Sequence, residues 1–213
     1  VFGLVASLLT VWTGDGSGYA IAQTQPMKLA AVEGYYEGQN GAGLVAVGLL
    51  NPEKKTYDDG QDPFLFRIEI PKMLSLLAER KVDAFVPGIK NIIEGGYELK
   101  DGTKALSAAE KIEKGKKAIA ALATYRTAKK EGDEAAAKEA YTTLQENVPY
   151  FGYGYIKDVN QLVPNVPLNF YAFRVMVILG GYFILFFILV LFFAYKKDLS
   201  KIRWMQYVAL WTI

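Results

Sequence analysis

VMVILGGYFILFFILVLFFAY, from Val175 to Tyr195, is the stretch that decides the fold class, because it holds 21 residues and no charged side chain. At about 1.5 Å of rise per residue, a helix of this length is roughly 31 Å long, enough to cross the hydrocarbon core of a bilayer. The alternative is a buried helix of a large soluble protein. Residues 182–188 argue against it, since an unbroken run of large apolar side chains leaves no polar face. We therefore predict a transmembrane helix within residues 169–195.

The charges that follow this helix predict its orientation. Residues 196–203, KKDLSKIR, contain four basic side chains and one acidic one. By the positive-inside rule this basic loop is expected in the cytoplasm. Residues 14–168 are then expected on the opposite, periplasmic side of the membrane.

Both ends of the sequence are apolar. Residues 1–13 include VFGLVASLLTVW, which is too short to span a bilayer and lacks the basic segment and cleavage site of a signal peptide. Residues 204–213, WMQYVALWTI, begin another apolar run. We interpret the first run as the outer end of one transmembrane helix and the last as the start of another. The sequence is therefore expected to be a piece of a polytopic protein.

Residues 14–168 have the size of one ordinary domain and carry nearly equal numbers of acidic and basic residues, as a solvated domain should. The predicted fold class is a mainly α-helical membrane protein, a polytopic helical-bundle fragment with a large α+β extramembrane loop domain. The elements expected in the loop are a glycine turn at Gly14, Gly16 and Gly18; helices from Pro26 to about Tyr36, from Pro71 to about Arg80, over 89–94, over 107–130 and over 133–146; and a strand at 64–70 paired with 44–50.

Composition excludes many kinds of site. The sequence has no His and no Cys, so it holds no Ser-His-Asp triad, no His metal site, no disulfide and no Cys-bound zinc or iron–sulfur cluster. A net charge of +2 gives no nucleic-acid footprint. No phosphate-binding loop occurs, and Asp58 and Asp59 lie in a polar turn where Asp is favoured for local reasons.

Three stretches are more specific than the rest of the chain. They are GDGSGY at 14–19, KLAAVE at 28–33 and FYAFRVM at 170–176, with a weaker fourth, FRIEIP at 66–71, followed by Val82 and Asp83. In this order and spacing they resemble subunit I of the cytochrome bd quinol oxidases. The resemblance covers the periplasmic quinol-binding loop of that family and the helix after it.

The resemblance implies an activity and a set of site residues. Quinol would be oxidised at the outer face, with Lys28 and Glu33 in quinol binding and proton acceptance. Met176 would be an axial ligand to the iron of a low-spin haem b, with Arg174 beside that haem. A further haem b and a haem d in the complete subunit would reduce oxygen to water and so generate proton motive force. The fragment alone is not expected to be active.

The same resemblance implies location and partners. The protein would lie in the lipid bilayer of the bacterial inner membrane and take ubiquinol or menaquinol and oxygen as substrates. Its protein partners would be subunit II and a small accessory subunit, and it would bind no nucleic acid. The alternatives are a non-enzymatic transporter or assembly factor with a large outer binding domain, or a membrane-tethered binding domain. For single residues the alternatives are packing for Met176, a snorkelling charge for Arg174, and surface charges for Lys28 and Glu33.

Overall fold

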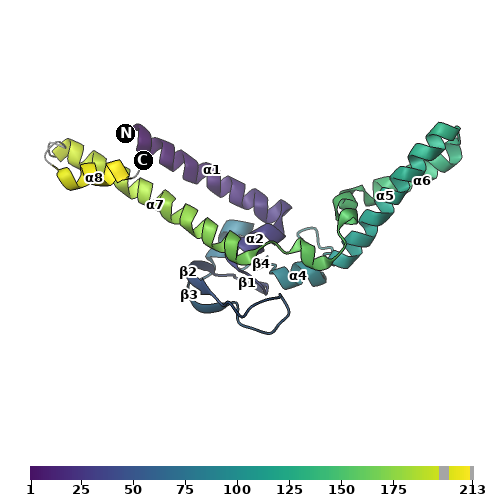
Figure 1. Cartoon of the computed structure of the whole chain (residues 1–213), viewed down its shortest axis with the longest axis horizontal. Helices are drawn as coiled ribbons and strands as arrows, with labels where there is room; N and C mark the ends of the chain where they lie inside the picture. The colour runs from purple at the N-terminus through teal and green to yellow at the C-terminus, as the bar shows by residue number, and fades with distance from the viewer. Residues whose placement is uncertain (197–201, 212–213) are drawn as a thin grey trace.

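The computed structural model describes residues 1–196 and 202–211, which are mainly helical and include two small sheets (Figure 1). The helices are α1 (Phe2–Thr24), α2 (Pro26–Glu33), α3 (Met73–Glu79), α4 (Ile89–Glu94), α5 (Ala108–Glu131), α6 (Glu134–Asn147), α7 (Val166–Lys196) and α8 (Arg203–Trp211). The strands are β1 (Gln39–Asn40), β2 (Leu44–Leu50), β3 (Phe64–Ile70) and β4 (Phe85–Val86), and two 3-10 helices, η1 (Val148–Tyr155) and η2 (Val159–Leu162), precede α7. The long helices α1 and α7 lie side by side at one end, and the α5–α6 hairpin projects from the other (Figure 1).

Helix α7 contains the whole of the predicted transmembrane segment. The apolar part of α7 has a mean hydropathy of 2.9. Among the described residues, this is the one helix that is long and apolar enough to cross a membrane. The helix begins before the apolar run because Asn165 caps it, its Oδ1 accepting a hydrogen bond from the Leu168 N–H at 3.0 Å. The predicted basic loop at 196–203 falls largely on residues 197–201, which lie outside the described residues.

The predicted glycine turn is wrong. Helix α1 continues without a break through Gly14, Gly16 and Gly18 and ends only at Thr24, with Gln25 as its C-cap. None of the three glycines has a left-handed backbone, and the Ser17 hydroxyl donates to the Thr13 carbonyl at 3.0 Å, as a continuous helix allows. Glycine costs a helix about 1 kcal/mol per residue relative to alanine, and packing of α1 against α7, α3 and α2 offsets this cost. The division into membrane, outer and cytoplasmic segments stays a prediction.

The predicted hairpin is confirmed. Strands β2 and β3 pair antiparallel, with Val47 opposite Ile68 and Leu49 opposite Phe66, and two irregularities in the register. Its inner face contributes Val45, Leu50 and Phe64 to a buried cluster with Phe170 of α7. The sequence did not predict β1 and β4, which pair over only two residues each.

The loop helices agree with prediction except at their ends. Helix α4 has the predicted bounds, and the α5–α6 pair is capped by Ser107 and Asp133, with left-handed Gly132 between them. Helix α2 ends at Glu33, before the predicted Tyr36, because Gly34 takes a left-handed conformation with φ of 62°. Helix α3 begins after Pro71, since Lys72 is also left-handed.

Candidate functional site

The second and third of the specific stretches meet at one buried ion pair. Arg174, near the start of α7, reaches Glu33, the last residue of α2: Nη2 lies 2.7 Å from Oε2 and Nη1 lies 3.5 Å from Oε1. Nη1 also lies 3.4 Å from the Val32 carbonyl oxygen. The Glu33 side chain is 3% exposed and that of Arg174 11%. The structure therefore brings two of the four predicted site residues into direct contact.

The backbone at Gly34 brings α2 against α7. A Cβ at this position would lie 3.0 Å from Phe64 Cζ, 3.2 Å from Leu50 Cδ2 and 3.3 Å from Phe170 Cδ2, and φ is positive. Only glycine can take the positive φ and leave room for these three side chains without strain. The helix can therefore end at Glu33, with the carboxylate of this residue facing α7.

Two rings of α7 surround the Arg174 guanidinium. The guanidinium carbon lies 4.5 Å from the Phe170 ring centroid and 5.5 Å from that of Phe173. Such cation–π contacts favour a cation in surroundings poor in water. Arg174 Nε is buried and has no hydrogen-bond partner among the described residues. The side chain can therefore donate one more hydrogen bond, which suits an anionic group.

The Glu33 carboxyl combines burial with a close cation. Burial raises the pKa of Glu33 above its ordinary value, while the charge and hydrogen bonds of Arg174 act in the opposite direction. Burial is the larger cause. A carboxylate whose pKa is raised has a higher proton affinity than an ordinary surface carboxylate, which favours a role as proton acceptor.

Lys28 lies in different surroundings from Glu33, although both belong to α2. It is exposed, and it lines a cavity of about 490 Å³ together with Lys111, Tyr153 and Asn169. Burial lowers the pKa of Lys111, whose Nζ lies 6.0 Å from the Tyr153 ring centroid. The structure thus places Lys28 among groups of positive or no charge and does not bring it to the Glu33–Arg174 pair.

Met176 lies on the exposed surface of α7, two residues after Arg174, with 59% of the residue accessible. Its thioether is free to bind a metal centre brought by a neighbouring part of the protein. Among the described residues no cluster of three or more His, Cys, Asp or Glu could hold a metal ion. Were a haem bound here, the exposed Met176 thioether would supply one of its ligands and the other would come from elsewhere.

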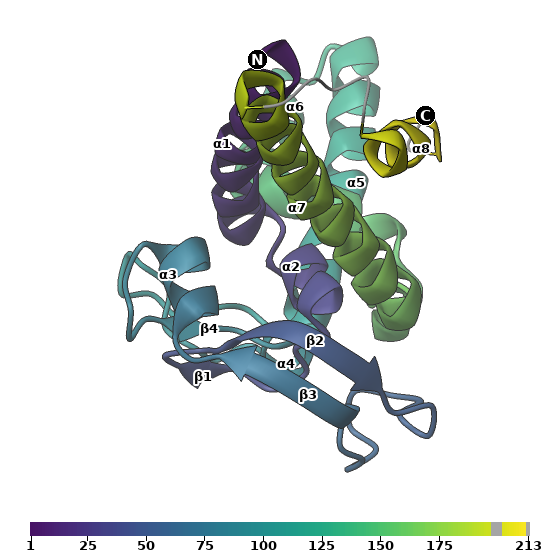
Figure 2. The same cartoon turned by 90° about the vertical axis from the view of Figure 1, so that its left-hand side faces the viewer.

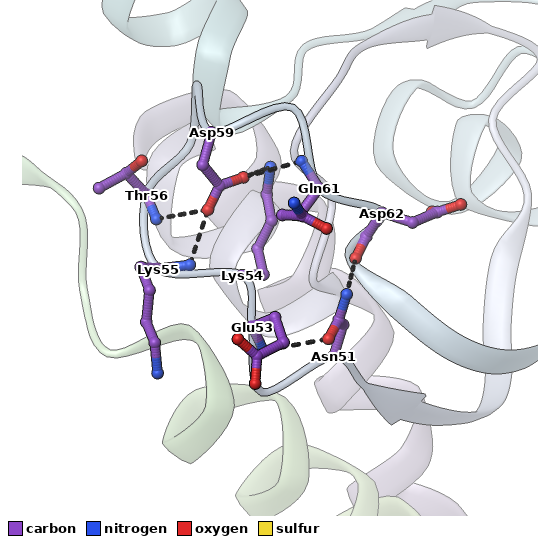
Figure 3. Close-up of polar contacts among 8 residues, drawn as sticks. All are labelled: Asn51, Glu53, Lys54, Lys55, Thr56, Asp59, Gln61 and Asp62. Carbon is purple, nitrogen blue, oxygen red and sulfur yellow. Dashed lines mark hydrogen bonds and ion pairs between the residues drawn. The ribbon is translucent and has the colours of Figure 1, made fainter.

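The turn between β2 and β3 is ordered by Asp59 (Figure 3). Its carboxylate accepts hydrogen bonds from Lys54 Nζ at 2.7 Å and from the backbone N–H groups of Lys55, Thr56 and Gln61 at 2.7–3.0 Å. These contacts hold the pKa of Asp59 far below its ordinary value. They confirm the local role predicted for this aspartate, and they place Lys54, whose side chain is 6% exposed, over the Tyr36 ring.

Comparison with known proteins decides the family. A sequence model described as cytochrome bd terminal oxidase subunit I matches residues 1–213. The chain belongs to this family. The match confirms the resemblance drawn from the motifs, and the ion pair joins two of the segments that carried it.

The chain is shorter than the proteins that it resembles. The chain is similar to cytochrome bd-II ubiquinol oxidase subunit 1 of Escherichia coli (strain K12), 29% identical over 231 aligned residues, which include 100% of this chain and 40% of that protein. It thus spans about two fifths of this relative's length. It is also similar to the bd oxidase structure from Geobacillus thermodenitrificans, with 22% identity, 85% of this chain and 34% of that one covered, and a TM-score of 0.36.

Sequence reasoning did not find the contact between Glu33 and Arg174. It selected both residues but treated them in separate roles, one at the quinol and one at the haem. The two lie 141 residues apart in the chain, so no spacing or periodicity could show that they meet.

Proposed function

We propose that the protein containing this chain is a quinol oxidase of a bacterial respiratory chain, located in the inner membrane. Quinol, either ubiquinol or menaquinol, is oxidised at the outer face, and the complete protein reduces oxygen to water. Family membership supports this proposal and counts against the transporter and assembly-factor alternatives. The observation that carries it is the buried Glu33–Arg174 pair, which joins the end of α2 to the start of the membrane-crossing helix.

In this proposal residues 14–168 form an α+β loop domain on the periplasmic side. The apolar parts of α1 and α7 extend to one side of it, as expected for helices that leave the domain and enter one bilayer (Figure 1). Glu33 lies at the boundary between the loop and α7, because its partner Arg174 directly precedes the apolar run at 175–195. A quinol diffusing in the membrane would therefore reach this end of the loop first.

Glu33 is the proposed proton acceptor. Oxidation of a quinol to a quinone releases two electrons and two protons, and a carboxylate close to a quinol hydroxyl can take one of these protons. The charge and hydrogen bonds of Arg174 favour the ionised form of Glu33, while burial, the larger cause, raises its pKa and so its proton affinity above that of an exposed glutamate. Lys28 is the proposed second contact, although it lies apart from the Glu33–Arg174 pair in this structure, and it would meet a quinol oxygen from the exposed side of α2.

Met176 is the proposed axial ligand of a low-spin haem b, with a histidine from a part of the protein beyond these residues as the other ligand. A haem with a His/Met pair has a raised reduction potential and so suits acceptance of electrons from quinol. Arg174 Nε, which is buried without a partner among the described residues, is available to an anionic group of that haem. A further haem b, a haem d, subunit II and a small accessory subunit belong to the complete enzyme.

The test uses Glu33→Gln in the complete enzyme. Loss of the proton acceptor is expected to lower kcat for quinol oxidation by about 100-fold or more, with the visible haem spectrum unchanged. Glu37→Gln is the matched control, because Glu37 lies four residues away and is exposed. Full activity in the Glu33 variant would refute its role while leaving the oxidase assignment intact.

A further inference from the structure

The outer face of the β2–β3 hairpin is apolar and uncovered. Register places Val47 opposite Ile68 and Leu49 opposite Phe66, so these side chains share one face, and Ile70 continues the alternation of β3. All five residues are exposed, between 42% and 56%. Groups of exposed large apolar side chains mark sites that contact a membrane, a ligand or another protein.

Both ends of the hairpin lie close to the predicted membrane boundary. At one end, the Leu50 N–H donates to Tyr171 Oη at 3.0 Å, and the Phe64 ring packs against Phe170 with centroids 5.6 Å apart. The apolar run of α7 begins at Val175, four residues after Tyr171. At about 1.5 Å of rise per residue, this end of the hairpin is therefore only about 6 Å along the helix axis from the start of the run.

The other end leads directly into α3, which is tied to α1. Arg80, at the end of α3, forms a bidentate pair with Asp15 at 2.5 and 3.1 Å. Asp15 lies one helical turn beyond Trp12, the last residue of the apolar run in α1. Helix α3 buries Leu74, Ser75 and Ala78, and leaves Leu76 and Leu77 exposed.

The exposed face of the hairpin is turned toward the membrane side. In Figure 1 the hairpin lies to the left of the start of α7, which its inner face contacts, and α7 runs to the left toward its C-terminus. The outer face is therefore turned in the direction of the membrane-crossing helices. Figure 2, viewed from that left-hand side, shows the broad face of the β2–β3 hairpin, with α3 beside it.

We propose that this outer apolar face, the five hairpin residues with Leu76 and Leu77, rests on the outer leaflet of the lipid bilayer. Lipid is the occupant that the observations favour, because the face lies at the level where α1 and α7 enter the membrane and is turned toward it. The basic residues around α3 do not argue for it, because Lys72 and Arg80 are paired with Asp83 and Asp15. Contact with lipid is inferred from the apolar side chains and their level.

This placement rests on the proposed outer location of the loop and adds a role to it. Phe64 and Leu50 of the hairpin also contact Gly34, the residue after Glu33. A hairpin held on the lipid surface therefore sets the height of Glu33 above the membrane in which a quinol diffuses.

The test is nitroxide accessibility in the complete enzyme in nanodiscs, after replacement of any background cysteines. Residues 1–213 contain none. Ile68→Cys and, separately, Leu49→Cys are labelled, and collision with oxygen and with a water-soluble nickel chelate is measured by power saturation. Lys55→Cys, in the exposed polar turn, is the control. Quinol oxidase activity of each labelled sample shows that the protein is folded, and activity lost in wild-type nanodiscs would count against the proposed function rather than the lipid contact.

Lipid contact predicts that both hairpin labels collide several-fold more with oxygen than with the nickel chelate, while the Lys55 label shows the reverse. Low collision with both reagents would mean that protein covers this face, whether another segment, another subunit or a second copy, and would overturn the proposal. High collision with the nickel chelate would mean that the face is in water, and would overturn it equally.

Discussion

Removal of Arg174 alone should be far more damaging than removal of both members of its ion pair. Arg174→Met retains a long apolar side chain but leaves the Glu33 carboxylate buried, 3% exposed, without the cation that lies 2.7 Å from it. Breaking a buried pair in this way costs about 3–5 kcal/mol of stability. In the double variant Glu33→Gln/Arg174→Met the buried group is a neutral amide, whose cost is about 1–3 kcal/mol.

The loss in Arg174→Met should depend on pH. Without Arg174 nothing opposes the effect of burial, so the pKa of Glu33 rises further above its ordinary value. The folded state then keeps a proton that the unfolded state releases, so stability falls as pH rises above the ordinary glutamate pKa, by up to about 1.4 kcal/mol per pH unit. The variant should therefore be closer to wild type at pH 5 than at pH 8, and the double variant should not show this difference.

The assay is the thermal unfolding midpoint of the complete enzyme in detergent, at one scan rate, at pH 5 and pH 8. Wild type, the two single variants and the double variant form a double-mutant cycle. Losses that add in the double variant would show that the two side chains are not coupled. An equal loss for Arg174→Met at both pH values would show that Glu33 is not the group that responds.

Three further predictions concern other parts of the chain. Met176→Leu should abolish the low-spin haem b band in a reduced-minus-oxidised spectrum of the complete enzyme, and an unchanged band would exclude Met176 as a ligand. Gly34→Ala should lower the free energy of unfolding by about 1–2 kcal/mol because its backbone is left-handed, and by more because the new Cβ would crowd Phe64. Gly102→Ala is the control for the backbone cost alone, because φ is also positive there but no atom lies within 4 Å of the added Cβ. Asp59→Ala should speed tryptic cleavage after Lys54 and Lys55, because the carboxylate that accepts four hydrogen bonds in the turn is removed. An unchanged digestion rate would mean that the turn is held by other contacts.

Local patterns predicted most of the elements. The alternation of apolar residues at 64–70 predicted strand β3, and the Ala, Lys and Glu content with Ser107 and Asp133 predicted the α5–α6 pair, because alternation, capping and helix propensity act over a few residues. The same local reasoning failed at Gly14, Gly16 and Gly18. Their weak helix propensity is overridden by packing of α1 on α7 and α3, which no local pattern displays.

The sequence by itself determined a helix long and apolar enough to cross a membrane, the family resemblance and the choice of Lys28, Glu33, Arg174 and Met176 as candidates. Charge-free length, helix propensity and short motifs are properties of contiguous residues, so they can be recognised without coordinates. Only the tertiary structure decided how the candidates are grouped. It pairs Glu33 with Arg174, 141 residues away, and leaves Lys28 in a separate cavity. That grouping depends on Gly34 and on the contact of the hairpin with Phe170, because burial and close approach are set by packing between segments distant in the chain.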